Sequence, residues 1–183
     1  MSVLDYRPTR APSAVKIHPG TLIEIFLLVA ISMGLLALFR RYSTDVAGGA
    51  DSYGYVSEAM RLARGHFYEA ERVFAPFGLP ENSSLTVTLG YRPFGPDGLV
   101  PTYPFGYPLL MAFAIRLAGI AGAFWVAPIL GTGAVLFTYL TGRQLLGRFG
   151  GLIAATLVAI LPNFLWSAFQ PMSDVPATFF VAL

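Results

Sequence analysis

Three long apolar runs dominate the hydrophobic pattern of this chain. They cover residues 21–39, 120–142 and 150–169, and each contains at most one charged side chain. A helix needs about 20 predominantly apolar residues to cross a hydrocarbon layer of ~30 Å, and each run has about that length. The pattern therefore predicts an all-α, polytopic membrane helical bundle with transmembrane helices in these three ranges.

The first run is preceded by a polar arm, residues 1–20, which contains prolines and basic side chains and is expected to be cytoplasmic. A retained membrane anchor is favoured over a cleaved signal peptide, because the run exceeds a typical signal core and ends in Arg40 and Arg41. Glu24 lies near the inner end of this anchor. Its side chain is expected to extend toward the lipid headgroups.

Residues 40–119 predict a large extracytoplasmic loop that contains interfacial helices. The first of these helices is expected near residues 51–65, where Tyr55 and three other apolar positions recur at helical spacing. Asp51 or Ser52 is expected to cap it and Gly65 to end it. Three charged residues are expected on its other faces: Glu58, Arg61 and Arg64.

The rest of this loop has less regular patterning. Residues 74–98 are rich in Pro, Gly, Asn and Ser, which predicts an irregular connection. Within it, residues 85–89 alternate between apolar residues and threonine, and a brief strand is expected there. A second interfacial helix is expected near residues 105–118.

The helix near residues 105–118 determines the topology. Its apolar part is too short for a span and contains Arg116, which favours a position in the membrane interface. The next span then runs inward, so the turn 143–149, with two arginines and no acid, is cytoplasmic as the positive-inside rule requires. Asp51 and Asp174 then share one outer face; a spanning helix would place them on opposite sides.

The composition agrees with a membrane protein. The chain is 55% hydrophobic and 12% charged, with a mean hydropathy of +0.63, whereas a soluble domain carries about 25% charged residues. The net charge is +2 without a run of basic residues, so no nucleic-acid partner is expected. The absence of cysteine excludes disulfides and Cys-ligated zinc.

The last residues suggest that more chain follows. Residues 170–176 predict a short extracytoplasmic loop, and the apolar residues 177–183 predict the start of a further transmembrane helix. Seven apolar residues are too few to span, and no stop-transfer pattern follows. The sequence is therefore expected to be the N-terminal fragment of a longer polypeptide.

Asp51 and Asp174 are the candidate catalytic residues. Two carboxylates on one water-facing rim could act as a general base and as an organiser of a metal ion or a phosphate. Low-dielectric walls would make such a carboxylate accept a proton more readily. Each aspartate could instead be a helix N-cap, Asp174 ahead of Pro176. The two roles are compatible, because a capping carboxylate can keep one oxygen available.

Four short motifs follow one another along the chain: DSYGYVSEAMRLARG (51–65), YPFGYP (103–108), LTGRQLLGR (140–148) and PMSDVP (171–176). In order and spacing they resemble the polyprenyl-phosphate-sugar-dependent glycosyltransferases of the GT-C superfamily. The most similar subset comprises protein O-mannosyltransferases, aminoarabinose transferases and RgtA/B/C/D-like bacterial proteins. The resemblance extends over nearly the whole chain after the N-terminal arm.

The resemblance implies a transferase site on the outer face of a bacterial plasma membrane. The donor would be a polyprenyl-phosphate-linked sugar, and the acceptor a lipid, a glycan or a protein. Asp51 matches the first-loop aspartate of the family, which acts at the reaction centre, and Asp174 matches the second site aspartate. Ser52 stands where many members have Glu. Tyr103 stands where the aminoarabinose type has Lys, which argues against that substrate and leaves the donor phosphate to another cation.

Four further residues are candidates for substrate binding. Arg92 is a candidate cation for the donor phosphate, with Arg61 and Arg64 as alternatives, although a solvated loop arginine is the simpler interpretation. Tyr55, Tyr103 and Tyr107 could stack on a sugar ring or orient an acceptor hydroxyl. The simpler assignment is the aromatic belt that membrane proteins place at the interface, which is rich in Tyr.

The reaction expected from the resemblance is an inverting displacement with Asp51 as the base. The only cofactor considered is a divalent metal, for which the sequence identifies no ligands. A non-catalytic membrane assembly subunit, whose outer loop binds a partner, is the main alternative. A lipid or solute transporter is disfavoured, because the predicted spans are apolar through their centres.

Overall fold

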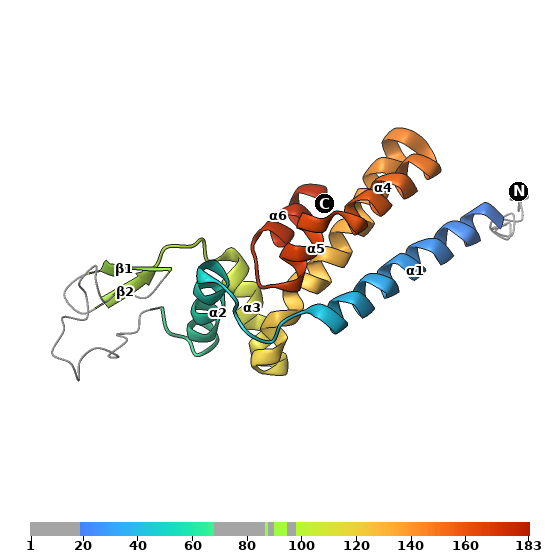
Figure 1. The fold of residues 1–183 in the computed structure, drawn as a ribbon. Coiled ribbons are helices and arrows are strands. Elements are labelled where there is room, and N and C mark those ends of the chain that lie inside the picture. The colour runs from blue at the N-terminus through green and yellow to red at the C-terminus, as the bar shows by residue number, and fades with distance from the viewer. Residues whose placement is uncertain (1–18, 68–86, 88–89, 95–97) are drawn as a thin grey trace, which may run out of the picture.

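The structure is a computed structural model and describes residues 19–67, 87, 90–94 and 98–183. Over these residues the chain is mostly helical, in agreement with the predicted all-α class, and adds one two-stranded sheet. In Figure 1 the sheet lies at one end of an elongated molecule, and α1 and α4 extend toward the other end. The elements in chain order are α1 (Pro19–Tyr42), α2 (Ala50–Ala63), β1 (Tyr91–Phe94), β2 (Gly98–Pro101), α3 (Gly106–Ala118), α4 (Ile120–Ile160), α5 (Pro162–Phe169) and α6 (Asp174–Ala182).

Two helices of the described residues are long and apolar enough to cross a membrane. They are Gly20–Tyr42, with a mean hydropathy of 2.6, and Ile120–Ile160, with 1.9. Large apolar side chains are exposed along the first helix; Phe26, for example, is 70% exposed. A continuous apolar surface of this kind is unfavourable in water and typical of contact with lipid or protein. By length and composition, these helices support membrane association.

The helix α4 reverses direction at Gly147. This glycine has φ 77° and ψ −177°, a left-handed backbone that strains residues with a Cβ. Figure 1 shows the two arms of α4, joined by this bend, lying side by side. The helical arms correspond to the predicted helices 120–142 and 150–169. The predicted turn 143–149 was wrong in extent, because helix continues through it on both sides of a single glycine.

The second arm ends before residue 169. It stops at Ile160, and Leu161 adopts an extended backbone with φ −67° and ψ 118° before Pro162 starts α5. Proline disfavours a helical conformation in the residue before it and has no N–H to donate, so it interrupts one helix and starts the next. The predicted single helix is therefore two.

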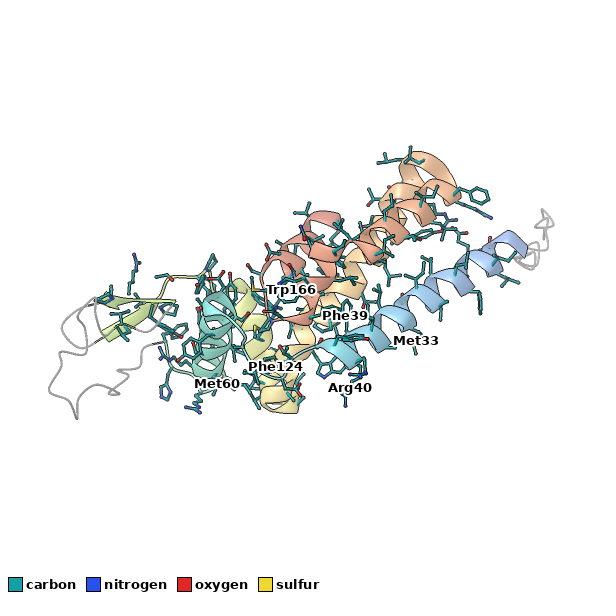
Figure 2. All side chains as sticks on the ribbon, in the orientation of Figure 1. Met33, Phe39, Arg40, Met60, Phe124 and Trp166 are labelled. Carbon is teal, nitrogen blue, oxygen red and sulfur yellow. The ribbon has the colours of Figure 1, made fainter. Side chains whose placement is uncertain are left out.

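The buried apolar residues form two clusters that both include α4. The first joins α1, both arms of α4, α5 and α6, with Phe39, Tyr139 and Val175 almost fully buried. The second joins α2 and α3 to the start of α4 around Met111 and Phe124. Figure 2 labels Phe39 and Phe124, one from each cluster. Because α4 contributes to both, it connects the long helices to the α2–α3 pair.

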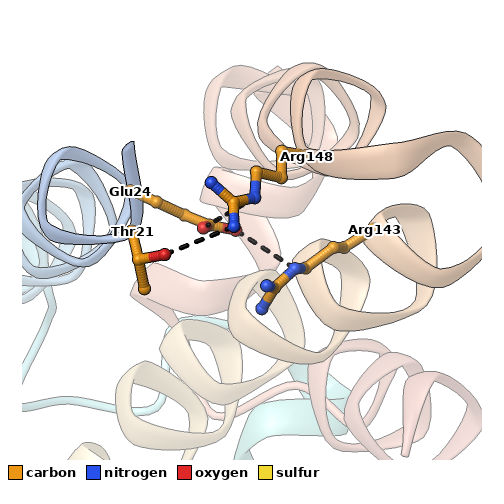
Figure 3. Close-up of polar contacts among 4 residues, drawn as sticks. All are labelled: Thr21, Glu24, Arg143 and Arg148. Carbon is orange, nitrogen blue, oxygen red and sulfur yellow. Dashed lines mark hydrogen bonds and ion pairs between the residues drawn. The ribbon is translucent and has the colours of Figure 1, made fainter. Parts of the chain in front are cut away.

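Glu24 joins α1 to the bend of α4. It is 4% exposed and forms ion pairs with Arg143 Nε at 3.2 Å and Arg148 Nε at 3.6 Å. Arg148 also donates a hydrogen bond to Thr21 Oγ1 at 3.3 Å (Figure 3). The expectation that Glu24 extends toward headgroups was wrong, because two cations from a distant part of the chain cover its carboxylate.

The predicted side-chain caps of α2 and α6 were also wrong. Gly49 is the N-cap of α2 and Ser173 that of α6, and neither helix has a side-chain cap hydrogen bond. Asp51 and Asp174 lie inside the first turns, where their negative charge is still favourable. Gly65, with φ 82°, follows the end of α2 as expected.

The sheet was not predicted. β1 and β2 pair antiparallel, with Tyr91 opposite Pro101 and Phe94 opposite Gly98. The irregular segment expected over residues 74–98 was therefore wrong for β1, whose proline at position 93 hides the strand pattern. Proline is tolerated here because a two-stranded sheet has only edge strands. The brief strand expected at 85–89 lies outside the described residues except for Val87, which is in no strand.

We expect Gly151→Ala to lower the stability of the protein. A Cβ at this position would lie 2.7 Å from the carbonyl oxygen of Tyr139 and 2.8 Å from the backbone nitrogen of Arg143. Backbone must then shift, at a cost of about 1–3 kcal/mol. Thermal unfolding in detergent measures the effect. The matched control is Gly34→Ala in α1, where nothing lies within 4 Å of the added Cβ; equal melting temperatures for the two variants would contradict the close packing.

Replacing both arginines, Arg143→Gln with Arg148→Gln, is expected to destabilise the fold by about 3–5 kcal/mol, because it leaves the buried Glu24 carboxylate without a counter-charge. Adding Glu24→Gln to this double variant removes the buried charge and should restore most of the loss. Denaturant unfolding of all three proteins tests the coupling. A triple variant no more stable than the double variant would show that the unpaired charge of Glu24 is not the cause of the lost stability.

Candidate functional site

Tyr103 lies at the centre of the candidate site, between two glycines. Its ring occupies the space that a side chain at Gly54 of α2 would fill, and a Cβ at Gly90 would lie 2.7 Å from ring atom Cε2. Thr102, the neighbour of Tyr103, donates hydrogen bonds from its backbone nitrogen and hydroxyl to the carbonyl of Gly90, at 2.9 and 3.0 Å. The ring is thereby held across α2.

The hydroxyl of Tyr103 donates a 2.5 Å hydrogen bond to Asp51 Oδ1. This hydrogen bond, with smaller contributions from burial and from the charge of Asp51, raises the pKa of Tyr103 to about 12. Tyr103 therefore keeps its proton at neutral pH and remains a donor to the carboxylate. Asp51 itself is exposed, so its carboxylate can also accept a proton or a hydrogen bond from a ligand.

Tyr55 and Tyr107 form a second row of aromatic rings beside Tyr103. The ring centroid of Tyr55 lies 4.7 Å from that of Tyr103 and 5.4 Å from that of Tyr107. Tyr55 and Tyr107 are each only 7% exposed, so the aromatic-belt interpretation was wrong for both. Burial also raises the pKa of Tyr107. These rings pack inside the protein and support the position of Tyr103.

The N-terminal half of α2 contacts the connection between α5 and α6. Tyr55 donates a hydrogen bond to Ser173 Oγ at 2.8 Å, and Ser52 Oγ lies 3.4 Å from Met172 Sδ. These residues neighbour Asp174 and Asp51, so the two aspartate-containing segments are in contact. The common outer face of the two carboxylates and their catalytic roles stay predictions.

Two cavities lie beside the contact between α2 and the α5–α6 connection. One, of about 250 Å³, is lined by Tyr55, Tyr107 and Ser173 together with apolar residues of α3 and α6 such as Leu110 and Phe180. Asp174 lines a different cavity of about 480 Å³, whose walls come from α4, α5 and α6. Asp51 lines neither of these two cavities.

Arg61, an alternative to Arg92 as the cation for the donor phosphate, is the more buried of the two, and the role of each stays a prediction. Arg92 is exposed on β1, whereas Arg61 is 5% exposed and its guanidinium lies 4.3 Å from the ring centroid of Tyr91. This distance allows a cation–π attraction. The hydroxyls of Tyr91 and Ser57 are also hydrogen-bonded, at 2.8 Å. The arrangement ties β1 to α2.

Glu58 was expected on a face of α2 other than its apolar face. It is 5% exposed, and its Oε2 has no hydrogen-bond partner among the described residues. Desolvation raises the pKa of Glu58 to about 7, and the positive charge of Arg61 opposes part of this rise. The helical spacing of Glu58 and Tyr55 places both on the Tyr103 side of α2, but this burial depends on a sheet that the sequence pattern does not reveal.

No group of three or more His, Cys, Asp or Glu side chains suited to a metal ion lies within the described ranges. The divalent metal considered from the sequence stays an untested prediction. No protein-family model matches the chain, and searches of curated proteins and of solved structures found no match. The resemblance to GT-C glycosyltransferases therefore rests on the four motifs alone.

We expect Glu58→Gln to stabilise the protein increasingly as the pH rises from about 4.5 to about 7. Because the pKa of Glu58 rises from 4.5 to about 7 on folding, the folded protein holds this proton more tightly than the unfolded chain. Its contribution to stability is present below about pH 4.5 and is lost as the pH rises through about 7. At pH 8 the variant should be more stable than wild type by roughly 2–3 kcal/mol.

Unfolding measured in detergent at pH 5 and pH 8 tests this expectation. The stability difference between Glu58→Gln and wild type should be small at the lower pH and large at the higher one. A difference that does not change with pH would mean that Glu58 titrates normally.

Proposed function

We propose that this chain is part of a membrane glycosyltransferase that moves a sugar from a polyprenyl-phosphate donor to an acceptor outside the cytoplasm. The observation that carries the proposal is the Asp51 carboxylate, exposed and held by the Tyr103 hydroxyl at 2.5 Å. A carboxylate with one oxygen fixed and its outer side accessible has the arrangement expected of a general base.

In the proposed reaction Asp51 takes the proton of an acceptor hydroxyl. The acceptor oxygen forms a bond to the anomeric carbon of the donor sugar, and the bond from that carbon to the phosphate oxygen breaks. The polyprenyl phosphate leaves with the bonding electrons, and the configuration at the anomeric carbon inverts. Tyr103 remains protonated and orients Asp51, which reduces the entropy cost of reaching the reactive geometry.

The apolar cavity beside Tyr55 supports a lipid-linked donor. Its walls include Leu110 of α3 and Phe180 of α6, while Tyr55 and Ser173 supply hydroxyls at its polar side. A prenyl chain would be sheltered by such walls while its phosphate stays near the polar groups. Arg61 is the buried cation on the same helix as Asp51.

The proposal also assigns a location to the site. α1, the first arm of α4, and the second arm of α4 together with α5 would cross the bacterial plasma membrane, with α2 and α3 as interfacial helices on its outer side. The position of the α4 bend supports this orientation. Its two arginines pair with Glu24 near the start of α1, at the end of α1 remote from α2, as expected for a short cytoplasmic turn.

We expect Asp51→Asn to reduce sugar transfer by about 10²–10⁴-fold, because the amide cannot accept the proton. Tyr103→Phe removes the orienting hydrogen bond but keeps the ring, so its loss should be smaller. The measurement is release of radiolabelled sugar from the polyprenyl-phosphate fraction of membranes that contain each variant.

The matched control is Asp45→Asn, an exposed aspartate in the connection before α2. It should transfer sugar at the wild-type rate. Near wild-type transfer by Asp51→Asn, with equal amounts of inserted protein, would end the assignment of Asp51 as base.

A further inference from the structure

We infer that the cavity beside the sheet-facing side of α2 is a subsite for one neutral monosaccharide ring. It is lined by residues of α2, of the segment that follows it, of β2 and of the segment that leads into α3, among them Glu58, Arg61, Phe67, Tyr103 and Phe105. It is separate from the apolar cavity between α3 and α6.

Its polar groups match hydroxyls better than an ion. Glu58 and Arg61 are both 5% exposed, and Glu58 Oε2 has no hydrogen-bond partner within the described segments. A buried acceptor without a partner is unfavourable, and a bound donor would remove that cost. A carboxylate beside a guanidinium is close to neutral as a pair, so it gives little net attraction to a charged ligand of either sign. A sugar hydroxyl can donate to the first and accept from the second.

The apolar walls match the carbon face of a sugar ring. Tyr103 lines the cavity, and Phe67 and Phe105 lie at its margin with 70% and 68% of their surface exposed. Exposed aromatic rings beside buried polar groups are typical of a binding site, in which a few polar groups determine orientation and aromatic faces supply contact area. The C–H groups of a pyranose or furanose ring provide a matching apolar surface.

The volume sets the size of the ligand. The cavity measures about 200 Å³, which is below the ~300–1,000 Å³ of pockets for drug-sized molecules. One sugar ring fits a cavity of about 200 Å³, whereas an oligosaccharide would extend out of it.

Tyr103 links this subsite to Asp51. Its ring lines the cavity while its hydroxyl binds the carboxylate, so a sugar bound beside Glu58 would lie next to the proposed base. The inference thus deepens the proposed function and rests on it for the purpose of the subsite, but binding of a sugar can be measured independently of transfer.

The test is ligand-observed saturation-transfer NMR with the purified protein in nanodiscs. The probes are D-mannose, D-glucose, D-galactose, N-acetyl-D-glucosamine and D-arabinose at millimolar concentration, with ethanolamine and inorganic phosphate as charged probes. At least one neutral sugar should bind wild type. At pH 8, where Glu58 is mostly ionised, Glu58→Gln should weaken sugar binding about tenfold, because a hydrogen bond to an ionised acceptor is stronger than one to an amide.

Arg64→Gln is the matched control, because Arg64 is exposed at the end of α2 and does not line the cavity. It should bind sugar as wild type does. Arg61→Gln is a second test of the polar end and should also weaken binding. Absence of binding by every neutral sugar, stronger binding of a charged probe, or an unchanged affinity in Glu58→Gln would each overturn the inference.

The two proposals can fail separately. Asp51→Asn should retain sugar binding while it loses transfer. Full transfer by Asp51→Asn with sugar binding that depends on Glu58 would refute the proposed base and leave the subsite standing. Loss of transfer in Asp51→Asn, together with unchanged sugar binding by Glu58→Gln, would refute the subsite and leave the proposed base standing.

Discussion

The packing of the Tyr103 ring between two glycines is the constraint on which the candidate site depends. Space for the ring exists only because Gly54 and Gly90 have no Cβ. From that position one side chain orients Asp51, contacts the ring of Tyr55 and forms a wall of the cavity next to α2. Three functions of the site thus share one aromatic ring, and a shift of that ring would alter all of them together.

Helix α4 connects the long helices to the candidate site. The start of α4 packs against α2 and α3, and its two arms pack against α1, α5 and α6. The close approach of Gly142 and Gly151 holds the arms together, so the connection that contains Ser173 has a defined place against Tyr55.

Local patterns predicted the helices well and the contacts between distant residues poorly. Apolar spacing located α2 and α3, because amphipathic periodicity depends only on neighbours in sequence. Asp51 and Asp174 were expected to share one outer face, and the segments that contain them are in contact. The burial of Glu58 was missed, because it depends on strands that contain proline. The bend at Gly147 was predicted as a longer turn, because composition shows a basic segment but not that one positive-φ residue suffices.

The ion pairs of Glu24 have a consequence for the order of assembly. Ribosomes deliver the N-terminus first, so α1 is made before either arginine of the α4 bend. During that interval the Glu24 carboxylate has no cation from α4, and in the proposed membrane arrangement a lone acid inside a span is costly. Synthesis of the bend then removes this cost, which favours pairing of α1 with the bend as soon as both exist.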